Sequence, residues 1–492
     1  MKLLKQILSV VLLAAIFGSC KKDLLDINVD PNNPTTVSAT PELVLPAALN
    51  ATVGIYNNST GGNNTFVFAG LWMGHTSYSG NYAIATENVS YALTNNFAAG
   101  TFALIYDNIE DYDFVEQKGV QQGNSFYRAI GMLMKAYNYQ TLVDLYNNVP
   151  YTQALQGTAV KTPAYDNGKA IYDDLGKKMD TAISLFKQSG NTSITGDIMF
   201  KGDNAKWQDF ANTVKLRLLL RQSQIADRQS YIKAEAAKFA GATFLASDAT
   251  VNPGYLNSAG KTNPFWGTNI NTAGTYTQEL YRANQFAINF YKSNNDPRLA
   301  KFYAPVAGTT NTFQGNSFGD QGVPNSKTST IGPGVLKSFS QSAVIMLGAE
   351  SYFLQAEAAL RGLITADAKM LYQTGVEQSF MYLGLTQAQA STYYSQNNNK
   401  DVNWDATTSM QEKLALIIRQ KWAAETWINE LEPYNDYRRL RLPSDIPLSS
   451  SPLSTGLLPN RLLYPQREFD VNGENVVAQG TIVPGSKVWW MP

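Results

Sequence analysis

Apolar residues recur at helical spacing over much of the chain, and this pattern constrains its fold more than any other feature. The spacing is clearest in the segment 125–150, where the residues expected to face inward are Phe126, Ala129, Ile130, Leu133, Ala136 and Tyr137. Pro150, after two asparagines and a valine, marks the end of this helix. Similar patterns predict helices over about 167–187, 205–224 and 410–430, so we expect a mainly α-helical fold.

A paired unit precedes the last of these helices. The segments 350–363 and 366–385 read as two helices joined by a tight turn at Gly362. From Glu350 to Leu383 the unit spans 34 residues, which is the length of one tetratricopeptide-type helix pair. Its small residues would let the two helices approach closely: Ala356, Ala359 and Gly375. We therefore expect a scaffold of tetratricopeptide-like helix pairs.

The stretch between about 244 and 348 differs from the rest. It is dense in Gly, Asn, Thr and Pro and lacks helical periodicity. Long irregular segments inside a compact domain are usually functional. A chain of this length also exceeds what one hydrophobic core usually organises. We expect a helical scaffold that carries a loop-rich, ligand-facing subdomain, the excursion 244–348.

The N-terminus reads as a lipoprotein signal. Lys2 and Lys5 precede the apolar run 7–17, which is too short to span a hydrocarbon core of about 30 Å. Cys20 follows at the place of cleavage, so we predict a signal peptide over 1–19, lipidation of Cys20 and a tether over 20–40. Because one acyl chain binds a membrane only marginally, stable anchoring implies more than one chain on Cys20. An ordinary signal peptide with an accidental cysteine is the alternative.

Cys20 is the only cysteine and His75 the only histidine, and this scarcity excludes several chemistries. His/Cys zinc sites have no ligand set, and a Ser-His-Asp triad would have to use His75, which we expect to be a polar loop residue. The sequence contains no G-x-S-x-G elbow, P-loop or dinucleotide fingerprint. We expect no catalytic residue, no metal site and no cofactor. The sequence leaves open whether a structural calcium ion is bound, although it contains no EF-hand loop.

The charge composition points to an uncharged ligand. Lys plus Arg and Asp plus Glu number 39 each, and charged residues are 16% of the chain, below the usual value of about 25%. No basic face is implied, so we expect no nucleic-acid partner. The surface is instead rich in amides, hydroxyls and 27 tyrosines, which suits neutral polyhydroxylated ligands. The alternative is that secreted proteins often have this composition.

Several stretches resemble the SusD/RagB family of surface glycan-binding lipoproteins, in its nutrient-binding SusD-like branch. The resemblance reaches from Asn28 to about Asn472. It is carried by DINVDPNNPTTVSATPELVLPAA, MLMKAYNYQTLVDLYNNVPYTQAL, MFKGDNAKWQDFANTVKLRLLLR, NDPRLAKFY, FLQAEAALRG, IIRQKWAAETWINELEPYNDYRRLRLP and NRLLYPQREFDVN.

The resemblance implies both a fold and a function. It implies a SusD-like α-helical domain over 41–492, with four tetratricopeptide-like helix pairs and a less regular ligand-facing part. It implies a lipid-anchored protein on the outer face of the bacterial outer membrane. The implied partner is a SusC-like TonB-dependent transporter in that membrane, which the protein covers as a lid. Such proteins capture oligosaccharides, or in some members peptides, and deliver them for uptake without enzymatic activity.

Two aromatic-bearing loops are the predicted ligand site. The first carries Trp72, Tyr78 and Tyr82, with Asn81 and Asn88 as hydrogen-bonding neighbours, and the second carries Trp266, Asn269, Asn271 and Tyr276. An aromatic face stacks on the apolar face of a pyranose, and amides exchange hydrogen bonds with its hydroxyls. The alternative is that these rings fill small cores beneath long loops.

The residues inside the family-like stretches have structural interpretations. We expect the arginines at 438, 439 and 441 to pair with Glu430, Glu432 and Asp436 at a helix end. We expect Trp422 and Trp427 to be core residues. Half-buried side chains with solvent-facing heads are predicted for Lys215, Arg217 and Arg221.

Two other functions remain open from the sequence. A glycoside hydrolase would need two carboxyls facing across a cleft, about 5–5.5 Å or 6.5–9.5 Å apart. The candidate cluster is Asp107, Glu110, Asp111 and Asp113, but neighbours on one helix seldom face each other, and a solvated helix face explains the run. A peptide- or protein-binding scaffold is the third hypothesis, because stacked helix pairs often bind partners on a concave face.

Overall fold

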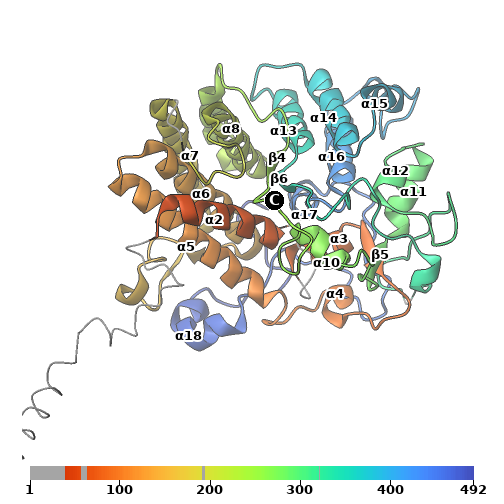
Figure 1. Ribbon diagram of the computed structural model, residues 1–492, viewed down its shortest axis with the longest axis horizontal. Helices are drawn as coiled ribbons and strands as arrows, with labels where there is room; N and C mark the ends of the chain where they lie inside the picture. Colours follow the sequence, from red (N-terminus) through yellow and green to blue (C-terminus); the bar gives the residue numbers. More distant parts are fainter. Residues whose placement is uncertain (1–38, 57–63, 191–193, 321) are drawn as a thin grey trace, which may run out of the picture.

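The structure of the chain, a computed structural model, describes residues 39–56, 64–190, 194–320 and 322–492. Within these residues the protein is mainly helical and its strands are short, which confirms the predicted fold class (Figure 1). The predicted signal peptide, Cys20 and all of the tether except residues 39 and 40 lie outside the described residues. Among the described helices, none combines the length and the apolar character that crossing a bilayer requires.

The first half of the scaffold is a series of helices that pack in sequence order: α5 (Ala99–Gln121), α6 (Ser125–Tyr146), α7 (Gly168–Ser189) and α8 (Asn204–Arg221). A further helix, α2 (Pro41–Tyr56), packs against α5. The predicted helices over 125–150, 167–187 and 205–224 are therefore confirmed, and α6 ends where Asn147 adopts a positive φ of 68°.

The second half of the scaffold contains the predicted helix pair, α13 (Gly348–Leu360) and α14 (Ala368–Tyr382). Gly375 of α14 faces Phe353 of α13 so closely that an added Cβ would lie 2.9 Å from its ring. The small residue thus permits the close approach that the sequence predicts. Helix α16 (Met410–Glu425) packs on both members, and α13 also contacts α8, which joins the two halves.

The helix predicted over 410–430 breaks after α16. Trp427 adopts a left-handed backbone conformation with φ of 62°, and its N–H donates to Glu430 Oε1 at 2.8 Å. The chain then enters α17 (Leu431–Leu440) in a new direction. Trp422 and Trp427 are both buried, as predicted for core residues.

The excursion 244–348 consists of short elements joined by loops: β4 (Ala249–Val251), α10 (Pro264–Asn269), β5 (Tyr281–Ala283), α11 (Gln285–Ser293), α12 (Leu299–Phe302), η5 (Asn325–Lys327) and β6 (Ala343–Met346). Three two-stranded antiparallel sheets occur in the described chain. β4 pairs with β6, β5 pairs with β1 (Thr76–Tyr78), and β2 (Val149–Pro150) pairs with β3 (Tyr165–Asp166).

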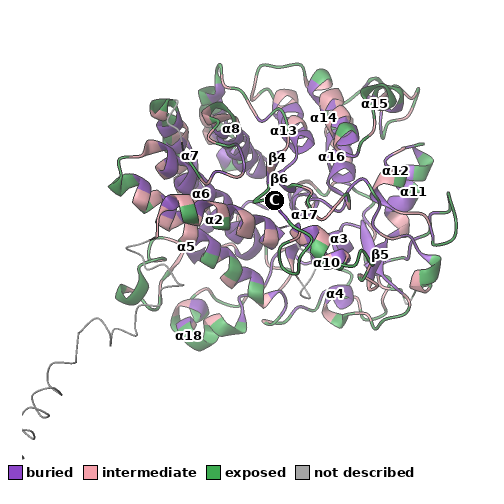
Figure 2. Ribbon diagram, viewed as in Figure 1, coloured by how far each residue is buried: buried purple, intermediate pink, exposed green. Residues whose placement is uncertain are grey.

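The remaining elements connect and cover these parts: α3 (Thr65–Trp72), α4 (Thr86–Ser90), η2 (Gly157–Ala159), η3 (Ala226–Arg228), α9 (Gln229–Ala236), η4 (Ala237–Phe239), α15 (Gln387–Tyr394), η6 (Trp404–Ala406) and α18 (Gln466–Val477). Every residue of α3 is buried, whereas α18 lies on the outside and is largely exposed (Figure 2). Figure 1 shows α4 and β5 on the opposite side of the molecule from α7.

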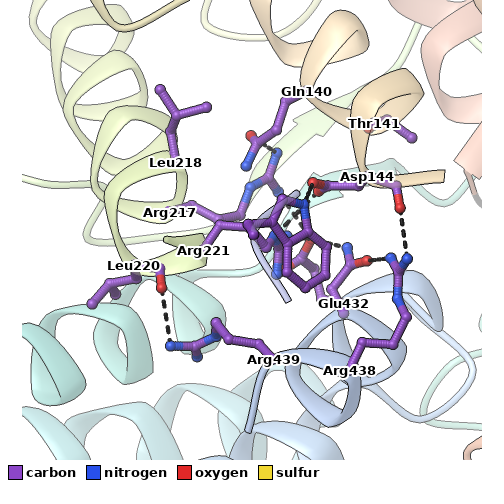
Figure 3. Close-up of polar contacts among 12 residues, drawn as sticks. Gln140, Thr141, Asp144, Arg217, Leu218, Leu220, Arg221, Glu432, Arg438 and Arg439 are labelled. Carbon is purple, nitrogen blue, oxygen red and sulfur yellow. Dashed lines mark hydrogen bonds and ion pairs between the residues drawn. The ribbon is translucent and has the colours of Figure 1, made fainter. Parts of the chain in front are cut away.

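A network of charged side chains lies in the core where α6, α8, α13 and α17 meet. Lys215, Arg217 and Arg221 are buried and ion-paired, so the prediction of solvent-facing heads was wrong. Figure 3 shows Arg221 between Glu432, whose Oε1 lies 2.6 Å from its Nη2, and Asp144, whose Oδ2 lies 3.1 Å from its Nε. Because the pairs connect different helices, they fix the helices relative to one another.

The arginines at the end of α17 also have structural roles. Arg439 pairs with Asp436 at 2.8 Å, as predicted, and additionally with Glu357 of α13 at 2.5 Å. Arg438 instead donates to the backbone carbonyl oxygens of Asp144 and Asn460, so its predicted carboxylate pairing was wrong. Both guanidinium groups are buried, whereas Arg441 is exposed and donates to Asn460 Oδ1 at 3.4 Å, so the carboxylate pairing predicted for Arg441 was also wrong.

Candidate ligand-binding site

The β1–β5 ribbon brings the two predicted ligand loops together. Tyr78, the last residue of β1, is opposite Tyr281, the first residue of β5. Because the strands are antiparallel, the loop that leaves β1 and the loop that enters β5 emerge at the same end of the ribbon. The N–H of Ser79 donates to Leu280 O at 2.8 Å and continues the pairing beyond the strands.

A third segment closes on these two loops. The buried amide of Asn316 donates through Nδ2 to Tyr78 O at 2.8 Å and to Val323 O at 3.0 Å. The N–H of Asn325 donates to Asn81 Oδ1 at 2.6 Å. We call the joined loop ends the rim, formed by Asn81, Tyr82, Tyr276, Glu279 and Asn325.

Tyr276 is positioned by a tight turn that follows α10. The N-cap Asn263 accepts from Trp266 N at 2.9 Å, and Pro264 begins the helix, where its missing N–H costs no hydrogen bond. Ile270 bridges to Tyr276 across the turn, and Thr277 N donates to Asn269 O at 2.8 Å. The second predicted loop is thus a short helix and a hairpin-like turn rather than irregular chain.

Trp72 is placed in the core and not at the rim. Its exposed fraction is 0%, its indole packs on Phe68 and Phe97, and Nε1 donates to Asn88 O at 3.1 Å. The ring therefore has no face open to a ligand in this structure. The physical reason is that α3 carries no charged residue and is buried on all sides.

Tyr78 and Asn269 are also buried, like Trp72, and hold neighbouring segments together. Tyr78 is 1% exposed and accepts a hydrogen bond from Asn88 Nδ2 at 2.8 Å, and burial raises the pKa of its phenol above the ordinary value. Asn269 is wholly buried and donates to Phe265 O at 2.7 Å, within α10. Both side chains support the ligand loops from beneath, and neither offers a surface to solvent.

The other three predicted aromatic residues are at least partly exposed, although the hydroxyl of Tyr276 is buried. Tyr82 is 41% exposed at the tip of the first loop, and Trp266 and Tyr276 are half-buried. Tyr276 has the guanidinium of Arg282 5.7 Å from its ring centre. Arg282 is ion-paired with Glu279, and Asn325 Nδ2 also donates to that carboxylate. A chain of contacts therefore links Tyr276, through Arg282 and Glu279, to Asn325.

A hollow of about 490 Å³ is lined in part by residues of α10. We call it the α10 hollow; its lining includes Asn50, Tyr255, Leu256, Lys261, Thr262 and Thr268. Tyr255 Oη donates to Asn50 Oδ1 at 2.7 Å, which ties the excursion to α2. The sequence interpretation missed these residues, because only their position in a Gly- and Asn-rich stretch distinguishes them from other loop residues.

His75 lies in the turn between α3 and β1, as predicted for a loop residue, but it is wholly buried. Its Nδ1 hydrogen-bonds with Glu430, and its ring lies 4.6 Å from that of Trp422. Its carbonyl oxygen accepts from Asn284 N and from Tyr303 Oη at 3.1 and 2.8 Å. His75 therefore fastens the start of β1 to the scaffold.

The acidic cluster considered for a hydrolase lies on one helix, α5. Asp113 is ion-paired with Lys135 of α6, and burial together with Glu110 and Asp107 raises the pKa of Asp111. These carboxyls do not face one another across the rim or the α10 hollow. In the part of the chain that the structure describes, no group of three or more His, Cys, Asp or Glu side chains is placed to hold a metal ion.

The family follows from the comparison with known sequences. A sequence model of the SusD-like family, described as "Starch-binding associating with outer membrane", matches residues 31–465. The chain belongs to the SusD-like family. Its matched span includes both predicted ligand loops, the excursion and the helices of the scaffold.

Solved structures share the fold of this SusD-like protein. An outer-membrane protein from Bacteroides vulgatus, described in connection with nutrient binding, is 23% identical over 92% of this chain and 100% of that chain, with a TM-score of 0.75. A chitin-binding SusD homologue from Flavobacterium johnsoniae is 22% identical, over 91% of this chain and 98% of that one, with the same TM-score. No curated protein matches the chain.

Proposed function

We propose that this SusD-like protein binds oligosaccharides at the rim and in the adjoining α10 hollow. The observation that carries the proposal is the pairing of Ser79 with Leu280, which joins two separately predicted loops into one surface. The family description names starch binding, and a structural relative binds chitin. Both support a saccharide ligand.

The rim has the chemistry that a sugar requires. Tyr82 and Tyr276 of the rim and Trp266 of the neighbouring α10 supply ring surface, and Asn81 and Asn325 supply amides. A sugar ring can lie flat on an aromatic face while its hydroxyls exchange hydrogen bonds with the amides. Because the surface is open and buries few ligand atoms, the affinity for a single oligosaccharide should be weak.

The wider setting belongs to the same proposal. Acyl chains on Cys20 would hold the protein on the exterior of the outer membrane, where it delivers its ligand to a SusC-like TonB-dependent transporter without cleaving it. The family description, which names association with the outer membrane, supports this location. Mass spectrometry of the protein extracted from membranes tests acylation, and a pull-down from solubilised outer membrane tests the partner.

Replacing Tyr82 or Trp266 with alanine should weaken oligosaccharide binding about 5- to 10-fold each, because a stacked ring contributes roughly 1 kcal/mol. Isothermal titration calorimetry, with ligands chosen from a glycan array, measures the effect. The matched control is Tyr394→Ala on α15, which removes a half-buried ring outside the rim and should leave the affinity unchanged.

The proposal fails if the double variant Tyr82→Ala/Trp266→Ala keeps its affinity and its melting temperature. A sensitive reducing-sugar assay on the purified protein should detect no release of fragments. Released fragments would instead support the hydrolase hypothesis.

A further inference from the structure

The excursion carries an excess of positive charge that the whole chain does not have. Residues 244–348 contain seven Lys and Arg against four Asp and Glu, a net charge of +3, whereas the chain is neutral overall. The remainder of the chain is therefore net negative. The excursion, which supplies most of the proposed ligand site, is the positive part of the molecule.

Ion pairs within the excursion do not remove this excess. Arg282 pairs with Glu279, and Arg298 pairs with Asp296. Two of the four carboxylates are thus already neutralised. Among the described residues, none of the five lysines of the excursion has a carboxylate oxygen within 4.0 Å; these are Lys261, Lys292, Lys301, Lys327 and Lys337. The positive charge consequently resides on these lysines.

Lys261 lies at one end of the proposed site, in the wall of the α10 hollow. It is exposed, and no acidic residue occurs among the described residues that line the hollow. Its backbone is fixed in a compact loop, where Lys261 N donates to Ser258 O at 2.9 Å and Leu256 N donates to Lys261 O at 2.8 Å. The loop therefore fixes the backbone from which the Lys261 side chain extends.

Lys327 lies at the other end, next to the rim. It is the last residue of η5, whose first residue, Asn325, donates to Asn81 Oδ1 beside Tyr82. Lys327 is exposed, and the nearest acidic group of the rim, Glu279, is occupied by Arg282 and Asn325. Two uncompensated cations thus flank the aromatic surface.

We propose that the ligand is an anionic glycan, whose carboxylate or sulfate groups meet Lys261 and Lys327 while its sugar rings stack on the rim. This inference rests on the proposed function and adds the charge class of the substrate. A positive field over an open surface also raises the rate of encounter with a negatively charged polymer. Because both lysines are exposed, the attraction should weaken as salt concentration rises.

The test compares the affinities of acidic oligosaccharides and of their neutral counterparts for the soluble protein, residues 21–492. The probes are galacturonate and alginate oligomers, their methyl esters, sulfated oligosaccharides from chondroitin, and chitin and starch oligomers. We expect at least one acidic probe to bind about tenfold more tightly than its neutral counterpart in 50 mM salt, with the preference reduced in 300 mM salt. Comparison of the carboxylate-bearing probes with the sulfated probes shows which of the two anionic groups the protein prefers.

The variants Lys261→Gln and Lys327→Gln should each weaken binding of the preferred acidic probe about threefold and leave its neutral counterpart unaffected. Lys233→Gln, at an exposed lysine of α9, is the matched control and should change neither. A neutral probe that binds as tightly as every acidic one, or an equal loss in the control, would overturn the inference and leave the proposed function intact. Absence of binding to all probes would overturn both.

Discussion

Replacing Arg298 with methionine is expected to lower the free energy of unfolding by about 3–5 kcal/mol, because it leaves Asp296 as an unpaired buried charge. Both side chains of this pair are 0% exposed, and Arg298 Nη2 lies 2.7 Å from Asp296 Oδ2. A buried carboxylate without its cation keeps the cost of desolvation and loses the attraction that offsets it. Urea unfolding followed by circular dichroism measures the loss.

The position of Arg298 adds to the expected effect. From the turn between α11 and α12 it also donates to Ser379 Oγ of α14 at 3.1 Å and to Gln420 Oε1 of α16 at 2.8 Å. One guanidinium group therefore connects the excursion to two scaffold helices. Methionine fills much of the same volume but satisfies none of these acceptors.

Two further variants separate the charge from the packing. Lys301→Met, three residues away and without an ion pair among the described residues, should cost less than about 1 kcal/mol. The double variant Asp296→Asn/Arg298→Met should recover part of the loss, because it removes the stranded charge. A single variant Arg298→Met that unfolds like the wild type would show that the pair contributes nothing to stability.

The helices were predictable because their signal is local. Apolar residues at a period of 3.6 identify α6, α7 and α8 from the sequence, whatever their neighbours are. The break between α16 and α17 was not predictable from the sequence, because apolar residues continue from Trp422 to Trp427 without a helix-stop signal. That break depends on a hydrogen bond between Trp427 and Glu430 and on a second one between Glu430 and the distant His75, which a local pattern does not contain.

The candidate site was predictable only in part. Both loops were identified from their aromatic residues and amides, but the sequence does not say which side of each ring faces solvent. Trp72 and Tyr82 stand ten residues apart in one loop-like stretch, yet one is in the core and the other is open. A signal was present for Trp72, since α3 is an eight-residue run without charge, which is typical of a buried helix.

The buried charges were the least predictable feature. Arg217 and Arg221 follow the pattern of a half-exposed helix, and their shared partner, Glu432, lies more than 200 residues away in sequence. Only the packed fold brings these groups together (Figure 3). The positive charge of Lys261 and Lys327 near the proposed site was likewise not predicted, because the charge of the whole chain is balanced even though the excursion is net positive.

One member of the buried charge cluster lacks a hydrogen-bonding partner. Glu425 of α16 is 0% exposed, and among the described residues no group lies within hydrogen-bond distance of either carboxyl oxygen. Burial raises the pKa of Glu425 well above its ordinary value of 4.5, and the neighbouring Glu350 raises it further. The folded protein therefore holds the proton on this carboxyl to a higher pH than the unfolded chain does.

Glu425→Gln is consequently expected to stabilise the fold, and increasingly so as pH rises. In the unfolded wild type Glu425 loses its proton above pH 4.5, whereas the folded state keeps it until the raised pKa is reached. The stability that the protonated group contributes is thus present below pH 4.5 and is lost with increasing pH. Glutamine imitates the protonated acid and has no such loss, so its advantage should grow by up to about 1.4 kcal/mol per pH unit between pH 4.5 and the raised pKa of the folded state.

The same substitution at Glu432 provides the control, because the pKa of Glu432 is shifted in the opposite direction. Burial would raise the pKa of Glu432, but Arg221, Arg217 and Lys421 hold it well below 4.5, so its contribution is present above pH 4.5 and is lost as pH falls. Glu432→Gln should therefore destabilise the protein at pH 7, and the deficit should shrink in acid. Chemical unfolding at several pH values measures both variants. If Glu425→Gln showed a difference that did not change with pH, or a deficit at pH 7, then Glu425 would be ionised in the fold and its proton would not be part of the native state.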